Sequence, residues 1–315
     1  MKKLAQIASA VQVSSTMAMD ALAKQMKADG IDVIGFGAGE PDFNTPDHIK
    51  VAADQAIADN ITRYTPASGT AVLKEAVCKR MREDCGLDYE PSQVVVSSGA
   101  KHCVYISLRT LIDPGDEVIL PAPFWVSYLE LIKMVGANPV IITAQESAGF
   151  KITAEQLSAA ITPKTKALIL NNPGNPTGMV YRREELESIA RVCVEKDIYV
   201  ISDEIYYGLL YDGMEFASFA SLGDEVKERT ILVNGVSKSY AMTGWRIGYM
   251  LANESTAKVM SNFISHSTGS PCTISQAASF AALDGSQNCV EEMRCAFEAR
   301  RNYIVERMNQ IDGVS

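Results

Sequence analysis

Four polar segments of this chain each follow a short apolar run, and together they carry the side chains best suited to chemistry. Lys238 and Asp203 each stand at or just beyond a β-branched run, Asn171 opens a segment that reads NNPGNPTG, and the segment SSGAK ends at Lys101. Ligands of open α/β sheets bind beside the carboxyl ends of the parallel strands. If the apolar runs form such a sheet, an amine, a carboxylate and several amide groups meet at one edge.

Each of these residues also has an ordinary structural explanation. A single lysine is usually a solvated surface residue, and an aspartate at a strand end is usually a turn residue or a helix cap. NNPGNPTG alone is a stiff turn, and SSGAK alone is a plain helix start. Nucleotide binding is disfavoured, because Glu40 replaces the last glycine of the fingerprint that begins at Gly35 and no phosphate-binding loop surrounds Lys238.

The apolar runs alternate with helical stretches, which predicts an α/β fold. We expect a three-layer sandwich with a mostly parallel central sheet. One strand is expected to be antiparallel, because the last two apolar runs are too close for a parallel crossover. The expected strands lie at 94–96, 117–120, 139–142, 166–170, 199–201, 231–233 and 246–251. The expected helices lie at 47–59, 72–84, 182–196 and 254–265, with one long helix from 276 onward that leaves the sheet.

Composition narrows the class of protein. The 315 residues carry a formal net charge of −9, which argues against a nucleic-acid-binding surface. The three histidines have no neighbouring ligands, so no metal site is predicted. The seven cysteines lack metal-like spacing and indicate reduced thiols in a cytoplasmic protein. Polar residues interrupt the apolar start of the chain, and no stretch is long enough to span a membrane, so neither a signal peptide nor a membrane span is predicted.

Taken together and in this order, the motifs resemble those of the fold-type I pyridoxal-phosphate aminotransferases of class I/II, especially the bacterial aspartate aminotransferases. The matching segments are GAGEPDFNTP at 37–46, NNPGNPTG at 171–178, SDEIY at 202–206 and the SK pair at 237–238 within VNGVSKSYAMTGWRIGY. The resemblance runs from about Thr16 to the end of the chain. It implies pyridoxal 5′-phosphate as the cofactor.

The resemblance also implies roles around the cofactor ring. Lys238 matches the catalytic lysine that binds the cofactor aldehyde as a Schiff base and later moves the proton of the substrate's α-carbon. Asp203 matches the acid that keeps the pyridine nitrogen protonated. Tyr206 and Asn175 match donors to the phenolic oxygen, and Trp125 matches the aromatic residue that stacks on the ring, although a large core anchor is the alternative for that side chain.

The cofactor phosphate needs amide donors and a cation. Gly99, Ala100 and Lys101 open a helix, whose first N–H groups are unpaired and favour anions. Ser237 and Arg246 match residues that add a hydroxyl group and a fixed charge.

The resemblance extends to the partner subunit and the substrate. Tyr64 matches a tyrosine that reaches the phosphate of the neighbouring subunit, which implies a homodimer. Gly39 matches the residue whose backbone meets the substrate α-carboxylate, and Thr16 and Lys101 match residues that meet the distal carboxylate, although a solvated lysine is the alternative. The residues expected at the substrate are Thr16, Gly39, Lys101, Trp125 and Asn175.

The implied reaction is transamination of aspartate with 2-oxoglutarate to oxaloacetate and glutamate. Three alternatives remain: a related transaminase for prephenate, aromatic or neutral amino acids, a pyridoxal-phosphate β-lyase, and a non-catalytic effector-binding domain. The last is disfavoured, because the chain is acidic and starts with the family's N-terminal arm.

The resemblance divides the chain into an N-terminal arm with a small-domain segment (1–45), a large cofactor-binding domain (46–282) and the start of a C-terminal small domain (283–315). Family members continue further and carry an arginine there that grips the substrate α-carboxylate. No motif assigns that role to Arg294, Arg300 or Arg301. The second domain is therefore expected to be incomplete, and this form is expected to bind the cofactor but to transaminate poorly.

Overall fold

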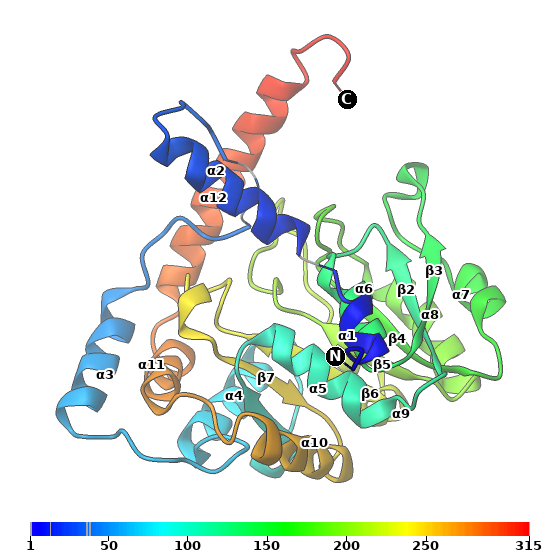
Figure 1. The fold of residues 1–315 in the computed structure, drawn as a ribbon, viewed down its shortest axis with the longest axis horizontal. Coiled ribbons are helices and arrows are strands. Elements are labelled where there is room, and N and C mark those ends of the chain that lie inside the picture. The colour runs from blue at the N-terminus through cyan, green and yellow to red at the C-terminus, as the bar shows by residue number, and fades with distance from the viewer. Residues whose placement is uncertain (1, 13, 36, 38, 315) are drawn as a thin grey trace.

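The computed structural model describes residues 2–12, 14–35, 37 and 39–314 of the chain (Figure 1). Phe36 and Ala38, which flank Gly37 in the predicted glycine-rich motif, lie outside the described residues. A seven-stranded sheet forms the centre, in the order β1-β7-β6-β5-β4-β2-β3. The strands are β1 (Val94–Ser97), β2 (Glu117–Ala122), β3 (Asn138–Thr143), β4 (Thr165–Asn171), β5 (Tyr199–Asp203), β6 (Thr230–Gly235) and β7 (Gly248–Leu251).

The sheet is parallel except at β7, which pairs antiparallel with both β1 and β6. The predicted single antiparallel strand is therefore confirmed. Because β1 and β6 are both antiparallel to β7, they point in the same direction as each other and as β4 and β5. The carboxyl ends of β1, β4, β5 and β6 consequently lie along the same edge of the sheet.

Helices cover both faces of the sheet and make the three predicted layers (Figure 1). Successive strand residues point to opposite faces. Leu168 packs with the helices of one face, whereas Ala167 and Ile169 pack with those of the other. The helices of the first face are α3 (Asp47–Ala58), α4 (Ala71–Cys85), α7 (Ala154–Ala160), α8 (Arg183–Glu195) and α11 (Thr273–Asp284), and those of the second are α5 (Ala100–Leu111), α6 (Ser127–Met134) and α10 (Glu254–Ser267).

The predicted helices α3, α4, α8 and α10 begin and end within two residues of their expected bounds. Local signals explain two of the ends. The side chain of Asn253 accepts a hydrogen bond of 2.9 Å from the Thr256 amide and caps α10, and Gly86 ends α4 with a φ of +65° that favours glycine. The remaining helices are α1 (Gln6–Ala10), α2 (Ser15–Ala28), α9 (Asp224–Glu228) and α12 (Asn288–Met308).

The prediction of one long helix from residue 276 is wrong, because α11 and α12 are separate helices. The break lies at Gly285, where an added Cβ atom would come within 2.5 Å of the Ala281 carbonyl oxygen. The Gln287 side chain donates to the carbonyl groups of Ala282 and Gly285 and stabilises the turn. Of these two helices, α12 leaves the sheet layers toward the C-terminus (Figure 1), whereas α11 packs against α3 and α4 in the core.

The described residues contain neither a membrane-spanning helix nor a metal-binding cluster. No helix there has both the length and the apolar character needed to cross a membrane. No group of three or more histidine, cysteine or acidic side chains in the same residues could hold a metal ion.

Candidate active site

The polar ends of β4 and β5 meet, as the sequence predicts. Asn171 and Asp203 are register partners, and the Asn171 side chain donates to the Asp203 carbonyl oxygen over 2.9 Å. The Asn171 side-chain oxygen accepts from the Asn175 amide at 2.8 Å. Asn175 in turn donates to the Tyr206 hydroxyl group at 3.2 Å. The rigid turn of NNPGNPTG thus holds Asn175 beside the segment that follows β5.

Lys238 follows β6 and lies at the same edge. Its Nζ atom is 5.7 Å from the centre of the Tyr206 ring and donates to the Gly39 carbonyl oxygen at 2.5 Å. Burial lowers the pKa of Lys238, and the nearby Arg246 guanidinium adds to that effect, while the carboxylates of Glu40 and Asp203 oppose it. The position therefore favours the neutral amine more than water does.

Asp203 is a buried carboxylate that is hydrogen-bonded through both oxygens. Only 3% of the surface of Asp203 is exposed to solvent. Oδ2 accepts from the Tyr128 hydroxyl group at 2.6 Å, and Oδ1 accepts from the Ile205 amide at 3.2 Å. Burial raises the pKa of Asp203 to about 6, against the opposing effects of these donors and of Lys238. Asp203 is therefore mostly ionised at neutral pH, although it is buried.

Tyr206 lies between these groups and remains a hydrogen-bond donor. Burial raises its pKa to about 12, the charge of Asp203 acts in the same direction, and the bond from Asn175 opposes the shift. The phenol is consequently protonated at neutral pH.

The end of β1 and the start of α5 form a site suited to an anion. Gly99 has a φ of +89°, and an added Cβ atom there would lie 2.3 Å from Nη2 of Arg246, so glycine is needed for the guanidinium to lie against the helix start. Gly248 on β7 has the same kind of role, because its added Cβ atom would lie 2.4 Å from the Ala100 amide nitrogen. The first N–H groups of α5 and the Arg246 guanidinium thus lie together, with Ser237 buried nearby in the chain segment of Lys238.

Arg246 is exposed and is held by backbone oxygens. Nη1 donates to the Thr243 carbonyl oxygen at 2.9 Å and Nη2 to that of Ser98 at 3.4 Å. The backbone of Arg246 has a φ of +57°, a conformation that costs free energy outside glycine and that is concentrated at functional sites in proteins.

An aromatic pair borders the site on the side of α6. The Lys101 ammonium group lies 4.9 Å from the centre of the Trp125 ring. The Trp125 and Tyr128 rings pack edge-to-face, with their centres 5.2 Å apart. Burial lowers the pKa of Lys101, and Arg246 contributes to the shift. None of the sequence motifs pointed to Tyr128. Its spacing of three residues from Trp125, at the start of a helix, was the one available signal that both rings face the same way.

Two predicted site residues are not brought to this cluster by the described contacts. Thr16 is exposed on α2, and its side-chain hydrogen bond is with Ser14 at 2.9 Å. Tyr64 is 98% exposed. The roles of both residues stay predictions.

The three arginines of α12 that had no predicted role are bound to acidic side chains. The pairs are Arg294 with Glu291 and Glu298, Arg300 with Asp42, and Arg301 with Asp212, all at 2.7 Å.

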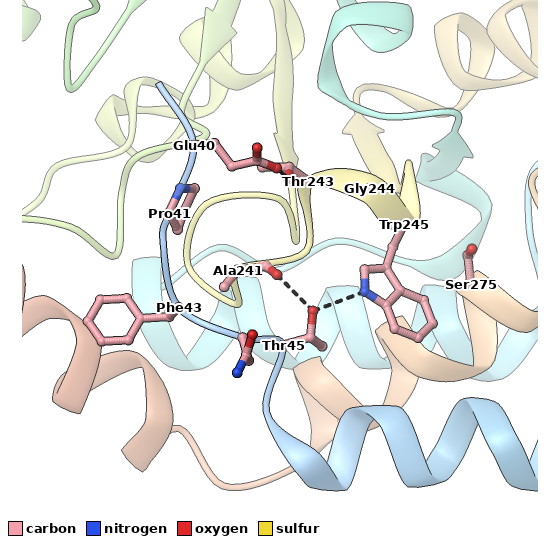
Figure 2. Close-up of a pocket in the computed structure, with 10 residues that line it drawn as sticks. Glu40, Pro41, Phe43, Thr45, Ala241, Thr243, Gly244, Trp245 and Ser275 are labelled. Atoms are coloured by element: carbon pink, nitrogen blue, oxygen red, sulfur yellow. Dashed lines mark hydrogen bonds between the residues drawn. The ribbon is translucent and has the colours of Figure 1, made fainter. Parts of the chain in front are cut away.

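A pocket of about 510 Å³ adjoins the Lys238 segment and is drawn in Figure 2. Figure 2 shows the Thr45 side chain between the Ala241 carbonyl group, to which it donates at 2.8 Å, and the Trp245 indole, from which it accepts at 3.0 Å. Glu40 meets Thr243 on the far side of the pocket. These contacts join the N-terminal segment to the loop that carries Lys238 and Arg246.

The donor set fits one cofactor. A half-buried amine with a lowered pKa suits an aldehyde, an ionised buried carboxylate suits a protonated ring nitrogen, and the glycine cradle beside Arg246 suits a phosphate group. Tyr206 and Asn175 suit a phenolate oxygen. A doubly covered α/β sheet with this set at its carboxyl edge defines a pyridoxal-phosphate-dependent enzyme.

Comparison with known proteins identifies the family. The model of the family described as aminotransferase class I and II matches residues 31–315. The aspartate aminotransferase of Bacillus sp. (strain YM-2) is 51% identical over 95% of this chain and 76% of that protein, and the one of Geobacillus stearothermophilus is 50% identical over 99% and 79%. The crystal structure of the Rhizobium meliloti aspartate aminotransferase superposes with a TM-score of 0.95 at 41% identity, over 99% of this chain and 78% of that one.

The chain belongs to the aminotransferase class I and II family. It is a pyridoxal-phosphate-dependent aminotransferase, as the motifs predict. The alignments span about three quarters of the length of these two relatives or slightly more.

Proposed function

We propose that this protein transfers the amino group of aspartate to 2-oxoglutarate and forms oxaloacetate and glutamate. The observation that carries the proposal is the position of Lys101, whose ammonium group lies over Trp125 beside the cationic Arg246. A second cation beside the site favours a substrate with two carboxylates over a neutral amino acid. The relatives that are about 50% identical are named aspartate aminotransferases, and a relative from Thermus thermophilus with a TM-score of 0.95 was solved with the dicarboxylate maleate.

Lys238 is the catalytic residue in this proposal. When bound, pyridoxal phosphate supplies a sink for the electrons released at the substrate's α-carbon. An amine must be neutral to add to an aldehyde or to take a proton from carbon, and the burial of Lys238 lowers its pKa in that direction. Nζ of Lys238 therefore serves as the attachment point for the cofactor and then as the base that moves the α-carbon proton.

The other ring contacts follow from charge. Asp203 holds the ring nitrogen protonated, since the carboxylate is ionised at neutral pH and has no freedom to turn away from its two donors. Tyr206 and Asn175, which already touch each other, donate to the phenolic oxygen. Trp125 stacks on the ring.

The phosphate group is held by the start of α5 and by the Lys238 segment. The amides of Gly99, Ala100 and Lys101, the hydroxyl group of Ser237 and the Arg246 guanidinium form this part of the site. The close packing of Arg246 on Gly99 supports this assignment of the phosphate-binding groups.

Substrate contacts are proposed for the two ends of aspartate. The Gly39 backbone meets the α-carboxylate, and it already lies within hydrogen-bond distance of Lys238. Lys101 and Thr16 meet the distal carboxylate, while Trp125 and Asn175 border the substrate.

We also propose a homodimer in which Tyr64 reaches the phosphate group bound by the partner subunit. Tyr64 is 98% exposed, so its side chain is free to reach a neighbouring subunit. Light scattering at assay concentrations should give twice the chain mass. A monomer that binds the cofactor with full affinity would contradict the proposal.

Two further proposals concern the chain as a whole. A boundary near residue 282 is supported by the course of α12 (Asn288–Met308), which runs away from the sheet after the end of α11 (Figure 1), and the boundary after residue 45 stays a prediction. A cytoplasmic location is supported by seven cysteines with no disulfide bond among them. Limited proteolysis and cell fractionation test the two proposals.

A Lys101→Ala variant tests the substrate proposal. We expect it to lower kcat/KM for aspartate by about 10- to 100-fold, because a hydrogen-bonded charge contact is lost, and to change kcat/KM for alanine by less than about threefold. The ratio of the two substrates does not depend on the absolute activity of this chain. Lys258→Ala, which removes an exposed lysine of α10, is the matched control.

The second candidate is a transaminase that also takes prephenate. Its support is a relative from Aquifex aeolicus, 44% identical over 99% of this chain, which is named a probable aspartate/prephenate aminotransferase. The same assay with prephenate as amino acceptor decides between the two. Equal losses for aspartate and alanine in Lys101→Ala would remove Lys101 from the specificity argument.

A further inference from the structure

We infer that the Tyr128 hydroxyl group is a positioning group of this enzyme, which holds the Asp203 carboxylate ionised and correctly oriented for the cofactor's ring nitrogen. The inference rests on the proposed function. Tyr128 acts through Asp203, so it is not itself a catalytic residue.

The contact has the geometry of a strong hydrogen bond. The Tyr128 oxygen lies 2.6 Å from Oδ2 of Asp203, the distance expected for a hydroxyl group that donates to a charged carboxylate. Tyr128 is only 2% exposed, so water does not compete for the bond. The Ile205 amide binds the other carboxylate oxygen. Two donors on two oxygens fix the plane of the carboxylate.

Tyr128 also contacts Trp125, the residue proposed to stack on the cofactor ring. Its amide donates to the Trp125 carbonyl group at 3.0 Å, and its ring lies edge-to-face against the Trp125 ring. The Tyr128 side chain therefore contacts both the acid and the aromatic residue proposed to stack on the cofactor.

The hydroxyl group has a second, electrostatic effect. Burial raises the pKa of Asp203 to about 6 even though Tyr128 donates to it. Removal of the donor takes away a group that stabilises the charged form, so the pKa rises further, toward the pH at which the enzyme works. Burial and the charge of Asp203 raise the pKa of Tyr128 far above its usual range, so this phenol always donates.

The titratable groups around Asp203 come from several elements. These are Tyr128 of α6, Cys103 of α5, Tyr206 after β5, Lys238 after β6 and the adjacent Glu204. A Tyr128→Phe variant leaves all the others in place and keeps the aromatic contact with Trp125, so it isolates the hydroxyl group.

The first experiment measures the affinity of Tyr128→Phe for pyridoxal 5′-phosphate as a function of pH, by titration of the bound cofactor's absorbance. We expect about 10-fold weaker binding near neutral pH, the effect of losing one hydrogen bond to a charged group. We also expect the midpoint of the pH dependence to rise by about one pH unit. Tyr249→Phe is the matched control, because the Tyr249 hydroxyl group is fully buried and has no hydrogen-bond partner among the described residues.

The second experiment is a double-mutant cycle with Asp203→Asn. If Tyr128 acts through Asp203, adding Tyr128→Phe to Asp203→Asn should leave the affinity unchanged within about twofold. An equal loss in both backgrounds overturns the inference, as does a Tyr128→Phe variant with the affinity and midpoint of the wild type. If Tyr128→Phe does not fold, Tyr128→His, whose ring nitrogen can still donate, replaces it. In that case, a Tyr128→His variant that binds pyridoxal phosphate about 10-fold more weakly, although its ring can still donate to Asp203, overturns the inference.

These outcomes separate the inference from the proposed function. A wild-type protein that takes up no pyridoxal phosphate refutes both. A wild-type protein that binds the cofactor and releases oxaloacetate from aspartate, with an unaltered Tyr128→Phe variant, refutes the role of Tyr128 alone.

Discussion

Glu204 offers a sharp test of the electrostatics of this fold, because it is buried beside Asp203 on the opposite face of the sheet. The residue is 1% exposed. Its Oε1 atom accepts three hydrogen bonds, from the hydroxyl groups of Ser202 and Ser218 and from the Phe219 amide, at 2.8 to 3.0 Å. Its Oε2 atom has no hydrogen-bond partner among the described residues. Burial raises the pKa of Glu204 from 4.5 to about 7, and the charge of Asp203 adds to the shift, while the three donors oppose it.

The magnitude follows from linkage. Below pH 4.5 the carboxyl group is protonated in both the folded and the unfolded chain and leaves the stability unchanged. Between pH 4.5 and 7 the unfolded chain ionises first, so the free energy of unfolding falls as pH rises, and above pH 7 the loss is complete. With these two pKa values, Glu204 makes the free energy of unfolding about 2–3 kcal/mol lower at pH 8 than at pH 5.

A Glu204→Gln variant removes this pH dependence. The glutamine oxygen can still accept the three hydrogen bonds, while its amide group stands where Oε2 had no partner, a cost of about 1–3 kcal/mol at every pH. Relative to the wild type, the variant should therefore gain about 2–3 kcal/mol of stability between pH 5 and pH 8. The Asp203 carboxylate is present in both proteins, so most of its own pH dependence cancels.

The assay is reversible urea unfolding of the cofactor-free protein at pH 5 and pH 8, followed by circular dichroism. Glu292→Gln on α12, which changes an exposed glutamate, is the control and should stay within about 0.5 kcal/mol of the wild type at both values. A difference between Glu204→Gln and the wild type that is the same at both pH values, within about 1 kcal/mol, would refute the reasoning.

Two further predictions follow from the site. Gly248→Ala should lower the free energy of unfolding by about 1–3 kcal/mol and weaken pyridoxal-phosphate binding, because its Cβ atom would lie 2.4 Å from the Ala100 amide nitrogen. Urea unfolding and cofactor titration measure the two effects. Gly244→Ala is the control, because its Cβ atom would have no neighbour within 4 Å. Lys238→Ala should hold no cofactor after borohydride reduction and denaturation, as measured by the intact mass. A retained mass of reduced cofactor would show that another amine forms the bond.

The centre of the sheet was predictable because its strands are buried on both faces. A parallel strand between two helical layers reads as a continuous apolar run, and β4 and β6 are such runs. The site edge was predictable for the same reason, since polar residues that end neighbouring parallel strands become neighbours in space. Asn171 and Asp203 are the clearest case.

The features that the sequence did not reveal depend on contacts between distant segments. Tyr128 reaches Asp203 across 75 positions of the chain, from a helix whose docking angle no local pattern encodes. The division between α11 and α12 was missed, because Gly285 is a weak signal and the Gln287 side chain supplies the stabilising bonds. The burial of Glu204 was also hidden, because its donors come partly from residues 218 and 219.

Asp203 at the end of β5 and the adjacent Glu204 show how buried acids near the site lower the stability of the fold. Asp203 faces the layer of α5 and α6, and Glu204 reaches the Ser218 segment on the other side, so both carboxylates are buried in one short stretch. Burial raises both pKa values, so both acids lower the stability of the cofactor-free protein as pH rises. A protonated ring nitrogen beside Asp203 offsets the cost of that charge, whereas nothing in the proposed site offsets the cost of Glu204. Stabilisation by pyridoxal phosphate should therefore grow as pH rises through about 6, the pKa of Asp203, and this growth should disappear in Asp203→Asn but persist in Glu204→Gln.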